Sequence, residues 1–388
     1  MIFDDRNELK DRYWWLQFWK ANNRILYGPE YLINGNGDSL LPCSTPSVDS
    51  SLRIPVLIEL GEDWIIHYTG ANYRRYIQDF EYQQRIRKEC AKYLDETIGF
   101  RLKPKVDTSS LLHGSVYGND IKYPEKSTPW LEPLLSGIED IKPFIKRMEA
   151  VDPLKMGLVP DFISGYKKLG RHYRWRILHD PGSVHGPGTI LGFLFGINNA
   201  ALLLCDAPDL MSDLLSLIAD VTIRYSQGVR LHTGFPAEGL GIYDDVAGLF
   251  SPEHFLKFFL PVYERLFNAF CRARETDRFI HNDAAISHLL PLYAELGVNG
   301  INPDPLSGLH EIRSILPDAF IYAGVPPLLL AEGPVEEIYK TAYSALEMMK
   351  GDAKFILTTA GSINEGTSLR HIQALCEAAV DFSERNTR

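Results

Sequence analysis

The second half of the chain alternates short apolar runs with longer amphipathic segments, a pattern that few folds accommodate. Apolar runs typical of strands lie at 240–243, 278–282, 300–302, 319–323 and 354–358. Helix-like segments follow them at 252–274, 285–296, 308–315, 334–350 and 368–384. Such regular alternation favours a parallel sheet whose strands are connected by crossover helices.

The whole chain offers about eight strand candidates and no glycine-rich dinucleotide fingerprint, which predicts an α/β fold of the (β/α)8 TIM-barrel type. A doubly wound open sheet is the alternative. The first strand is expected at 54–60, followed by a helix at 73–98, a strand-like piece at 115–123 and a helix at 133–151. Further apolar runs lie at 158–162 and 184–195, and a helical region at 199–231 is broken at Pro208.

Residues 1–53 are predicted to form an N-terminal extension packed on a barrel formed by residues 54–388. The extension begins with an aromatic helix candidate at 11–20, whose tryptophans need burial, and continues as a polar loop at 34–51. Together these patterns predict a (β/α)8 barrel with an N-terminal helical extension.

Composition excludes several classes of protein. The 388 residues carry a net charge of −10, which argues against nucleic acid and anionic membranes as partners. No uncharged apolar stretch reaches the roughly 18 residues of a membrane span, and the N-terminus lacks a signal-peptide pattern, so a cytoplasmic location is expected. The five cysteines are never spaced as CxxC, which is unlike a disulfide framework or a thiolate zinc site; they are Cys43, Cys90, Cys205, Cys271 and Cys376.

Two adjacent acids, Asp244 and Asp245, follow the apolar run at 240–243, and a helix start follows them. Ser251 suits the N-cap and Pro252 the first helical position. Carboxylates at the carboxyl end of a barrel strand lie where such folds bind ligands. The acids could equally cap the loop by bonding its backbone.

Polar residues also end the following strands. His281 and Asp283 are two positions apart, so both side chains can face the barrel mouth as an acid–base pair or as metal ligands. Asp304 stands between two prolines and could instead fix a turn. The predicted catalytic residues are His281, Asp283, Asp244 and Asp245; the substrate-binding residues are Glu59, Tyr243, Asn282, Asp304, Tyr322 and Ser362; the metal ligands are His281, Asp283 and Glu238.

Several segments in order resemble the uroporphyrinogen decarboxylase superfamily. They are GPGTILGFLFG at 186–196, CDAPDLMSDLLSLIADVTI at 205–223, IYDDVAGLFSPEHFLKFFLPVYERL at 242–266, the stretch 279–305 and AGSINEGTSLRHIQALCEAA at 360–379. The resemblance covers roughly residues 55–384 and implies a (β/α)8 barrel. It implies one of two chemistries: decarboxylation of uroporphyrinogen without a cofactor, or methyl transfer involving a corrinoid protein, often with zinc.

Departures from the family patterns narrow this choice. The decarboxylases carry an RQAGRY-type segment that binds substrate carboxylates, whereas residues 61–76 read GEDWIIHYTGANYRRY, with Arg74 and Arg75 but without the pattern. The thiol-methylating branch binds zinc with a His-x-Cys pair and a later Cys; here Asp283 and Ser362 replace the two thiolates. The remaining option is a metal site whose ligands are nitrogen and oxygen atoms, which are harder than thiolates. It would be formed by His281 and Asp283 with Glu238, Asp244 or Asp245, and would resemble the branch that demethylates ethers.

The resemblance therefore favours a corrinoid-dependent methyltransferase acting on a small methylated, for instance methoxylated, substrate, with zinc as the metal. The corrinoid would belong to a separate protein, because the chain has no DxHxxG segment. The alternatives are a cofactor-independent decarboxylase and a barrel that binds a ligand without turnover. The expected partners are a small-molecule substrate, a corrinoid protein and a second copy of the chain in a homodimer, with no nucleic acid or membrane.

Overall fold

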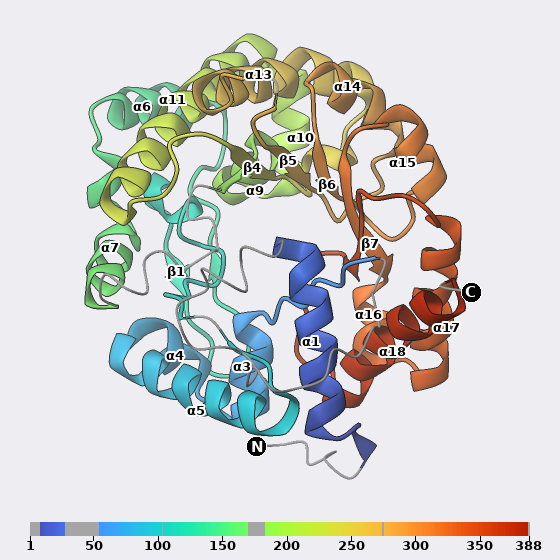
Figure 1. Ribbon diagram of the computed structural model, residues 1–388. Helices are drawn as coiled ribbons and strands as arrows, with labels where there is room; N and C mark the ends of the chain where they lie inside the picture. Colours follow the sequence, from blue (N-terminus) through green and yellow to red (C-terminus); the bar gives the residue numbers. More distant parts are fainter. Residues whose placement is uncertain (1–7, 28–53, 103, 170–182, 274, 387–388) are drawn as a thin grey trace.

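A computed structural model describes residues 8–27, 54–102, 104–169, 183–273 and 275–386 (Figure 1). Its centre is a parallel sheet of six strands: β3 (Val184–His185), β4 (Leu240–Tyr243), β5 (Arg278–His281), β6 (Gly300–Asn302), β7 (Phe320–Val325) and β8 (Phe355–Thr359). Neighbouring strands follow the order of the chain throughout. A doubly wound sheet would reverse that order at a switch point, so the sheet is wound in one direction, as in a barrel.

The segment before α3 continues the sheet beyond β8. Val56 forms a parallel bridge with Leu357, and Leu60 forms one with Ile363. The predicted strand at 54–60 is therefore present only as these two bridges. The α/β class is confirmed, and the strand order is consistent with a (β/α)8 barrel, although the strands of the described residues do not close a ring of backbone hydrogen bonds.

The side chain of His113 holds the β3 edge of this opening. The backbone N–H of His185, at the end of β3, donates to Nδ1 of His113 at 3.0 Å. His113 Nε2 lies 3.1 Å from Thr222 Oγ1. Because Nδ1 accepts a hydrogen bond, Nε2 must carry the proton of the neutral ring and donate it to the threonine. His113 thus ties the end of β3 to its own segment and to α11.

Helices surround the sheet (Figure 1). The helices that precede β3 in the chain are α1 (Arg12–Tyr27), α3 (Glu62–Thr69), α4 (Tyr73–Gln78), α5 (Phe80–Ile98), α6 (Ile138–Glu149) and α7 (Val159–Lys168). After β3 come α9 (Pro187–Phe195), α10 (Ile197–Asp206), α11 (Pro208–Thr233), α12 (Pro252–His254) and α13 (Leu260–Phe270). The last are α14 (Leu290–Glu295), α15 (Leu309–Ile315), α16 (Pro327–Glu332), α17 (Val335–Met348) and α18 (Leu369–Arg385).

The two faces of the sheet differ in burial. Side chains that alternate along the strands on one face are fully buried, among them Ile242, Ile280, Ile301 and Ile321. On the opposite face, Tyr243 is 37% exposed and Phe320 is 45% exposed. Alternation with a period of two explains the contrast, because successive side chains of a strand point to opposite faces.

The N-terminal helix α1 packs on the rest of the protein through its aromatic residues. Trp15, Phe18 and Trp19 are buried, and Trp19 Nε1 donates to the carbonyl of Ile98 at 2.8 Å. The Asn22 amide makes two 2.7 Å hydrogen bonds, to the backbone N–H and carbonyl of Val56. The helix therefore holds the edge of the segment that pairs with β8.

Several expectations about local structure are wrong. The helix expected at 73–98 is interrupted at Asp79, whose carboxylate caps α5. The strand expected at 115–123 is a 3-10 helix at Gly114–Tyr117 followed by β1 (Ile121–Lys122), which pairs with β2 (Trp130–Leu131). The apolar run at 158–162 lies largely in α7, α16 was not expected, and the helix at 252–274 contains a π-helical turn at Phe255–Phe259.

Two further predictions concern cysteines and membranes. Cys90, Cys271 and Cys376 are buried and free, whereas Cys43 and the loop at 34–51 lie outside the described residues. In the described part of the chain no single helix is both long and apolar enough for a membrane span; α9 and α10 reach that composition only as a pair bent by 104°.

Candidate active site

Polar side chains meet where β3 to β6 end. The register places His185 opposite Tyr243, Tyr243 opposite His281, and His281 opposite Asn302. The ring centroids of Tyr243 and His281 are 5.3 Å apart. These four positions form one row across the carboxyl ends of four parallel strands, which is where barrel enzymes place their active sites.

Asn302 fixes the tautomer and orientation of His281. Its Nδ2 donates to the carbonyls of Tyr322 at 2.5 Å and Thr359 at 3.0 Å, which determines which way the amide faces. Its Oδ1 therefore accepts from the backbone N–H of Gly361 at 2.7 Å and from Nδ1 of His281 at 2.9 Å. With the proton on Nδ1, neutral His281 presents the lone pair of Nε2.

Two carboxylates face that Nε2 atom. Asp283 Oδ1 lies 3.5 Å from it and Asp245 Oδ1 lies 3.8 Å from it. The backbone N–H of Asp283 also donates to Asp245 Oδ1 at 2.8 Å. The imidazole is nearly buried, whereas both carboxylates are about half exposed. One ligand atom from each of the three residues lies within 4.8 Å of the others.

Electrostatics favour the protonated form of His281 and of Asp245. Burial lowers the pKa of His281, but the hydrogen bond and charge of Asp283 and the charge of Asp245 outweigh it, so the pKa is raised overall. Burial raises the pKa of Asp245, and the Asp283 carboxylate adds to that rise against the opposing effects of His281 and the Asp283 N–H. A divalent cation would satisfy the same negative charges in place of the proton.

The donor set fits a zinc ion. One imidazole nitrogen and two carboxylates from one cluster are ligands that zinc accepts, and three protein ligands leave a position for substrate. The prediction of His281 and Asp283 as a pair at one site agrees with this geometry. Glu238 does not join them: it precedes the amino end of β4, and its Oε2 lies 3.5 Å from Thr276 Oγ1. The side chains that the structure brings together are therefore His281 and Asp283 with Asp245, and not with the predicted Glu238.

Asp244 points away from this cluster. It is fully buried, and its Oδ1 accepts from the backbone N–H of Thr189 at 2.6 Å while Oδ2 accepts from the N–H of Gly188 at 3.1 Å and from Tyr263 at 2.9 Å. These N–H groups begin α9, so Asp244 caps that helix from another element. Burial raises the pKa of Asp244 to about 6 against these hydrogen bonds. Its geometry gives it a supporting position rather than the catalytic one predicted.

Two other predicted residues also bond the backbone. Asn282 is fully buried, its Nδ2 donating to the Asp244 carbonyl at 2.6 Å and its Oδ1 accepting from the Ala284 N–H at 2.9 Å. Asp304 Oδ1 accepts from the N–H groups of Leu306 and Ser307 at 2.7 and 2.9 Å. The structure therefore favours the alternative in which Asp304 fixes a turn. The Asn282 side chain bonds the backbone and does not join the cluster of Asp245, His281 and Asp283.

The remaining predicted residues lie around the cluster. Ser362 follows Gly361, and a Cβ added at Gly361 would lie 3.6 Å from His281 Cε1. The carbonyl of Glu59 accepts from the Ile363 N–H at 2.7 Å, which places Glu59 beside the same loop. The carbonyl of Tyr322 is one of the two acceptors that orient Asn302.

A second row of residues, which sequence reasoning did not single out, lies two positions earlier on the strands. Gly241 pairs with Phe279, Phe279 with Gly300, and Gly300 with Phe320. A Cβ at Gly300 would lie 3.1 Å from the Phe279 ring, and one at Gly241 would lie 3.5 Å from it. Glycines on both neighbouring strands thus make room for this ring, which contacts Tyr243 and Tyr322 at centroid distances of 6.1 and 5.6 Å.

A charged cluster near α3 and α5 was also not predicted. Arg87 Nη1 lies 2.6 Å from Asp107 Oδ2, which also accepts from Tyr76 at 2.6 Å. Lys105 lies 3.6 Å from Asp107 and 3.8 Å from Glu62. These residues connect α3, α4 and α5 to residues 105–107, and the amphipathic pattern of a helix gives no sign that its Arg87 is buried.

Removing the Asn302 side chain should release the His281 ring. We expect Asn302→Ala to change the neutral form of His281 from a single Nδ1–H tautomer to a mixture, and to weaken zinc binding about 10- to 100-fold, the usual effect of losing a group that orients a ligand. Nitrogen-15 NMR of the ring and zinc titration measure the two effects. Asn198→Ala, on the exposed side of α10, is the control. An Nε2–H tautomer in the unaltered protein would contradict the assignment.

Comparison with known proteins agrees with the resemblance. A solved structure described as a methyltransferase from Methanosarcina mazei is 19% identical over 85% of this chain and 94% of that chain, with a TM-score of 0.64. A B12-independent methionine synthase from Shewanella sp. W3-18-1 is 11% identical over 53% and 61%, with a TM-score of 0.37. A search of curated proteins finds no match.

The family model for uroporphyrinogen decarboxylase (URO-D) matches residues 108–382. The matched region contains every strand of the six-stranded sheet together with Asp245, His281 and Asp283. Because it spans well over half of the sequence, the chain belongs to the uroporphyrinogen decarboxylase family.

Proposed function

We propose that the protein is a methyltransferase that removes a methyl group from a small methoxylated substrate and passes it to a corrinoid on a separate protein. The observation that carries the proposal is the convergence of Asp245, His281 and Asp283 at the strand ends, with Nε2 of His281 facing two carboxylates. Membership of the family, and a similar fold in a protein described as a methyltransferase, support it.

Zinc held by these three residues would supply a Lewis acid for the ether oxygen of the substrate. The protein residues determine where that oxygen lies. Asn302 keeps the His281 ring in one orientation, and the Asp283 N–H keeps the Asp245 carboxylate beside it. A reduced corrinoid would supply the electron pair that accepts the methyl group, so that the carbon–oxygen bond would break and the oxygen held at these residues would take up a proton.

The aromatic row favours a flat substrate. Tyr243, Phe279 and Tyr322 lie on the same face of the sheet as His281, and the Tyr243 side chain is 37% exposed to solvent. Aromatic side chains bind other rings by offset or edge-to-face contacts. A methoxylated ring placed against Tyr243 would bring its oxygen toward the metal ligands.

The two arginines at the place of the decarboxylase segment contact neighbouring side chains at the end of their own helix. Arg74 and Arg75 are both exposed on α4, where Arg75 lies 3.2 Å from Asp79 and Arg74 lies 3.3 Å from Gln78. A substrate with several carboxylates needs cations directed into its site. This observation favours methyl transfer over the decarboxylase alternative.

The test is turnover with defined components. Zinc-loaded protein is mixed with a reduced corrinoid protein and a panel of methoxylated phenols, and we expect demethylated product by mass spectrometry together with loss of the cobalt(I) absorbance. Asp245→Asn should reduce the rate at least 100-fold, whereas the control Glu238→Gln should not change it. No product from any methyl donor would contradict the proposal, and turnover that survives chelation would indicate acid–base chemistry instead.

A further inference from the structure

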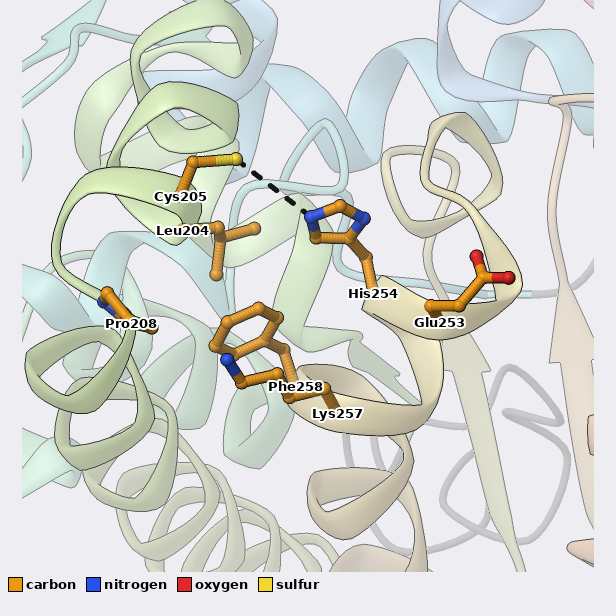
Figure 2. A pocket seen from close by; sticks show the side chains of 7 residues that line it. All are labelled: Leu204, Cys205, Pro208, Glu253, His254, Lys257 and Phe258. Carbon is orange, nitrogen blue, oxygen red and sulfur yellow. Dashed lines mark hydrogen bonds between the residues drawn. The ribbon is translucent and has the colours of Figure 1, made fainter.

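A second group of reactive side chains lines a surface pocket outside the strand ends (Figure 2). The pocket has a volume of about 200 Å³ and lies between the end of α10 and the start of the helix that follows Ser251. Its walls are formed by Leu204, Cys205, Pro208, Glu253, His254, Lys257 and Phe258. None of these residues belongs to the Asp245, His281 and Asp283 cluster.

Cys205 is the accessible thiol of the described residues. Cys90, Cys271 and Cys376 are buried, whereas Cys205 is exposed. Its Sγ lies 3.9 Å from Nε2 of His254, and Figure 2 shows the imidazole facing the thiol across the pocket. Exposure and a neighbouring base are the conditions under which a cysteine becomes a nucleophile.

Ser251 orients the His254 ring. Its Oγ lies 3.0 Å from Nδ1 of His254 and also accepts from the backbone N–H of His254 at 3.3 Å. In the tautomer whose Nδ1–H donates to Ser251 Oγ, Nε2 carries the lone pair and is a base for the thiol.

The rest of the pocket indicates what could bind beside the thiol. Lys257 contributes a cation, and Leu204 and Phe258 contribute apolar surface. The Lys257 Nζ lies 4.9 Å from the centre of the Phe258 ring, which holds the charge at the pocket wall. A π-helical turn at Phe255–Phe259 carries both residues, and such turns are frequent at functional sites.

We propose that Cys205, His254 and Lys257 form a nucleophilic thiol site that undergoes exchange with a small anionic disulfide. His254 Nε2 takes the thiol proton, and the Cys205 thiolate attacks one sulfur of the disulfide. A new sulfur–sulfur bond forms to Cys205, the original one breaks, and the second half leaves as a thiolate that takes up a proton. The disulfide is the oxidant and Cys205 is oxidised, so the exchange needs no other reactant. Lys257 pairs with a carboxylate of the incoming molecule.

Oxidised glutathione is the probe, and peptide mass spectrometry of the full-length protein measures the rate of mixed-disulfide formation at each cysteine at pH 7. We expect Cys205 to react about tenfold faster than a cysteine in an unstructured peptide, since an ordinary thiol is only a few per cent ionised at this pH. His254→Gln should remove that advantage. His310→Gln, exposed on α15, is the matched control and should leave the rate unchanged.

The contribution of Lys257 is tested with a second probe. Lys257→Gln should slow the reaction with oxidised glutathione several-fold and leave the reaction with neutral 2-hydroxyethyl disulfide unchanged. Circular dichroism establishes that each variant is folded. A rate at Cys205 equal to that of the peptide thiol, or an equal rate in His254→Gln, would overturn the proposal.

Discussion

Replacing His281 by alanine is expected to abolish zinc binding and methyl transfer together. The change removes the single nitrogen of the donor set and leaves the carboxylates of Asp245 and Asp283 facing each other without the imidazole. We expect the zinc dissociation constant to rise at least 1,000-fold, which is about 4 kcal/mol of binding free energy. Zinc titration calorimetry measures it, with Asp245→Ala and Asp283→Ala expected to show losses of about 10- to 1,000-fold each.

Glu238→Gln is the matched control, because it removes a carboxylate that precedes the other end of β4. It should bind zinc as the unaltered protein does. Circular dichroism should show that His281→Ala is folded. Unchanged zinc affinity in His281→Ala, or a loss in Glu238→Gln similar to that in Asp245→Ala, would be incompatible with the site described above.

The two adjacent acids should contribute very differently to the stability of the fold. Asp244→Ala leaves the N–H groups of Gly188 and Thr189 and the hydroxyl of Tyr263 without their buried acceptor. We expect it to lower the free energy of unfolding by about 3–5 kcal/mol, since each unpaired buried donor costs about 1–3 kcal/mol. Asp245→Ala changes a half-exposed side chain and should cost less than about 1 kcal/mol. Denaturant unfolding measures both.

The Asp244 carboxyl should also make stability depend on pH. Its pKa is raised to about 6 in the folded protein, from an ordinary value of 3.8, so between these values the folded state holds a proton that the unfolded state has released. That contribution to stability is complete below pH 4 and is lost as the pH rises through 6. Asp244→Ala should lack this decline. An Asp244→Ala protein as stable as Asp245→Ala would mean that Asp244 does not support the fold.

The fold was predictable because its strands and helices alternate. The expected strand at 300–302 has the observed bounds of β6, and the strands around His281 and Tyr322 were expected within a few residues of their places. The first half was less predictable. The segment at 54–60 has only isolated bridges, and the piece at 115–123 forms a 3-10 turn and a short strand, because local composition does not specify which segments find a pairing partner.

The site was predictable in part. His281 and Asp283 could be paired because they are two residues apart at one strand end, and the structure places their side chains together. The roles of Asp244 and Asp245 could not be separated, because neighbouring residues point in different directions and the partner, α9, is more than 45 residues earlier in the chain. Asn302 lies at the end of β6, and only the strand register, which the sequence does not contain, brings it opposite His281.

Zinc anomalous diffraction from a crystal of the protein grown with one equivalent of zinc tests the central claim most directly. The account predicts a single strong peak within about 2.0–2.2 Å of His281 Nε2 and of a carboxylate oxygen from each of Asp245 and Asp283. A peak at other residues, or no peak at the ends of β4 and β5 while zinc is bound in solution, would contradict it.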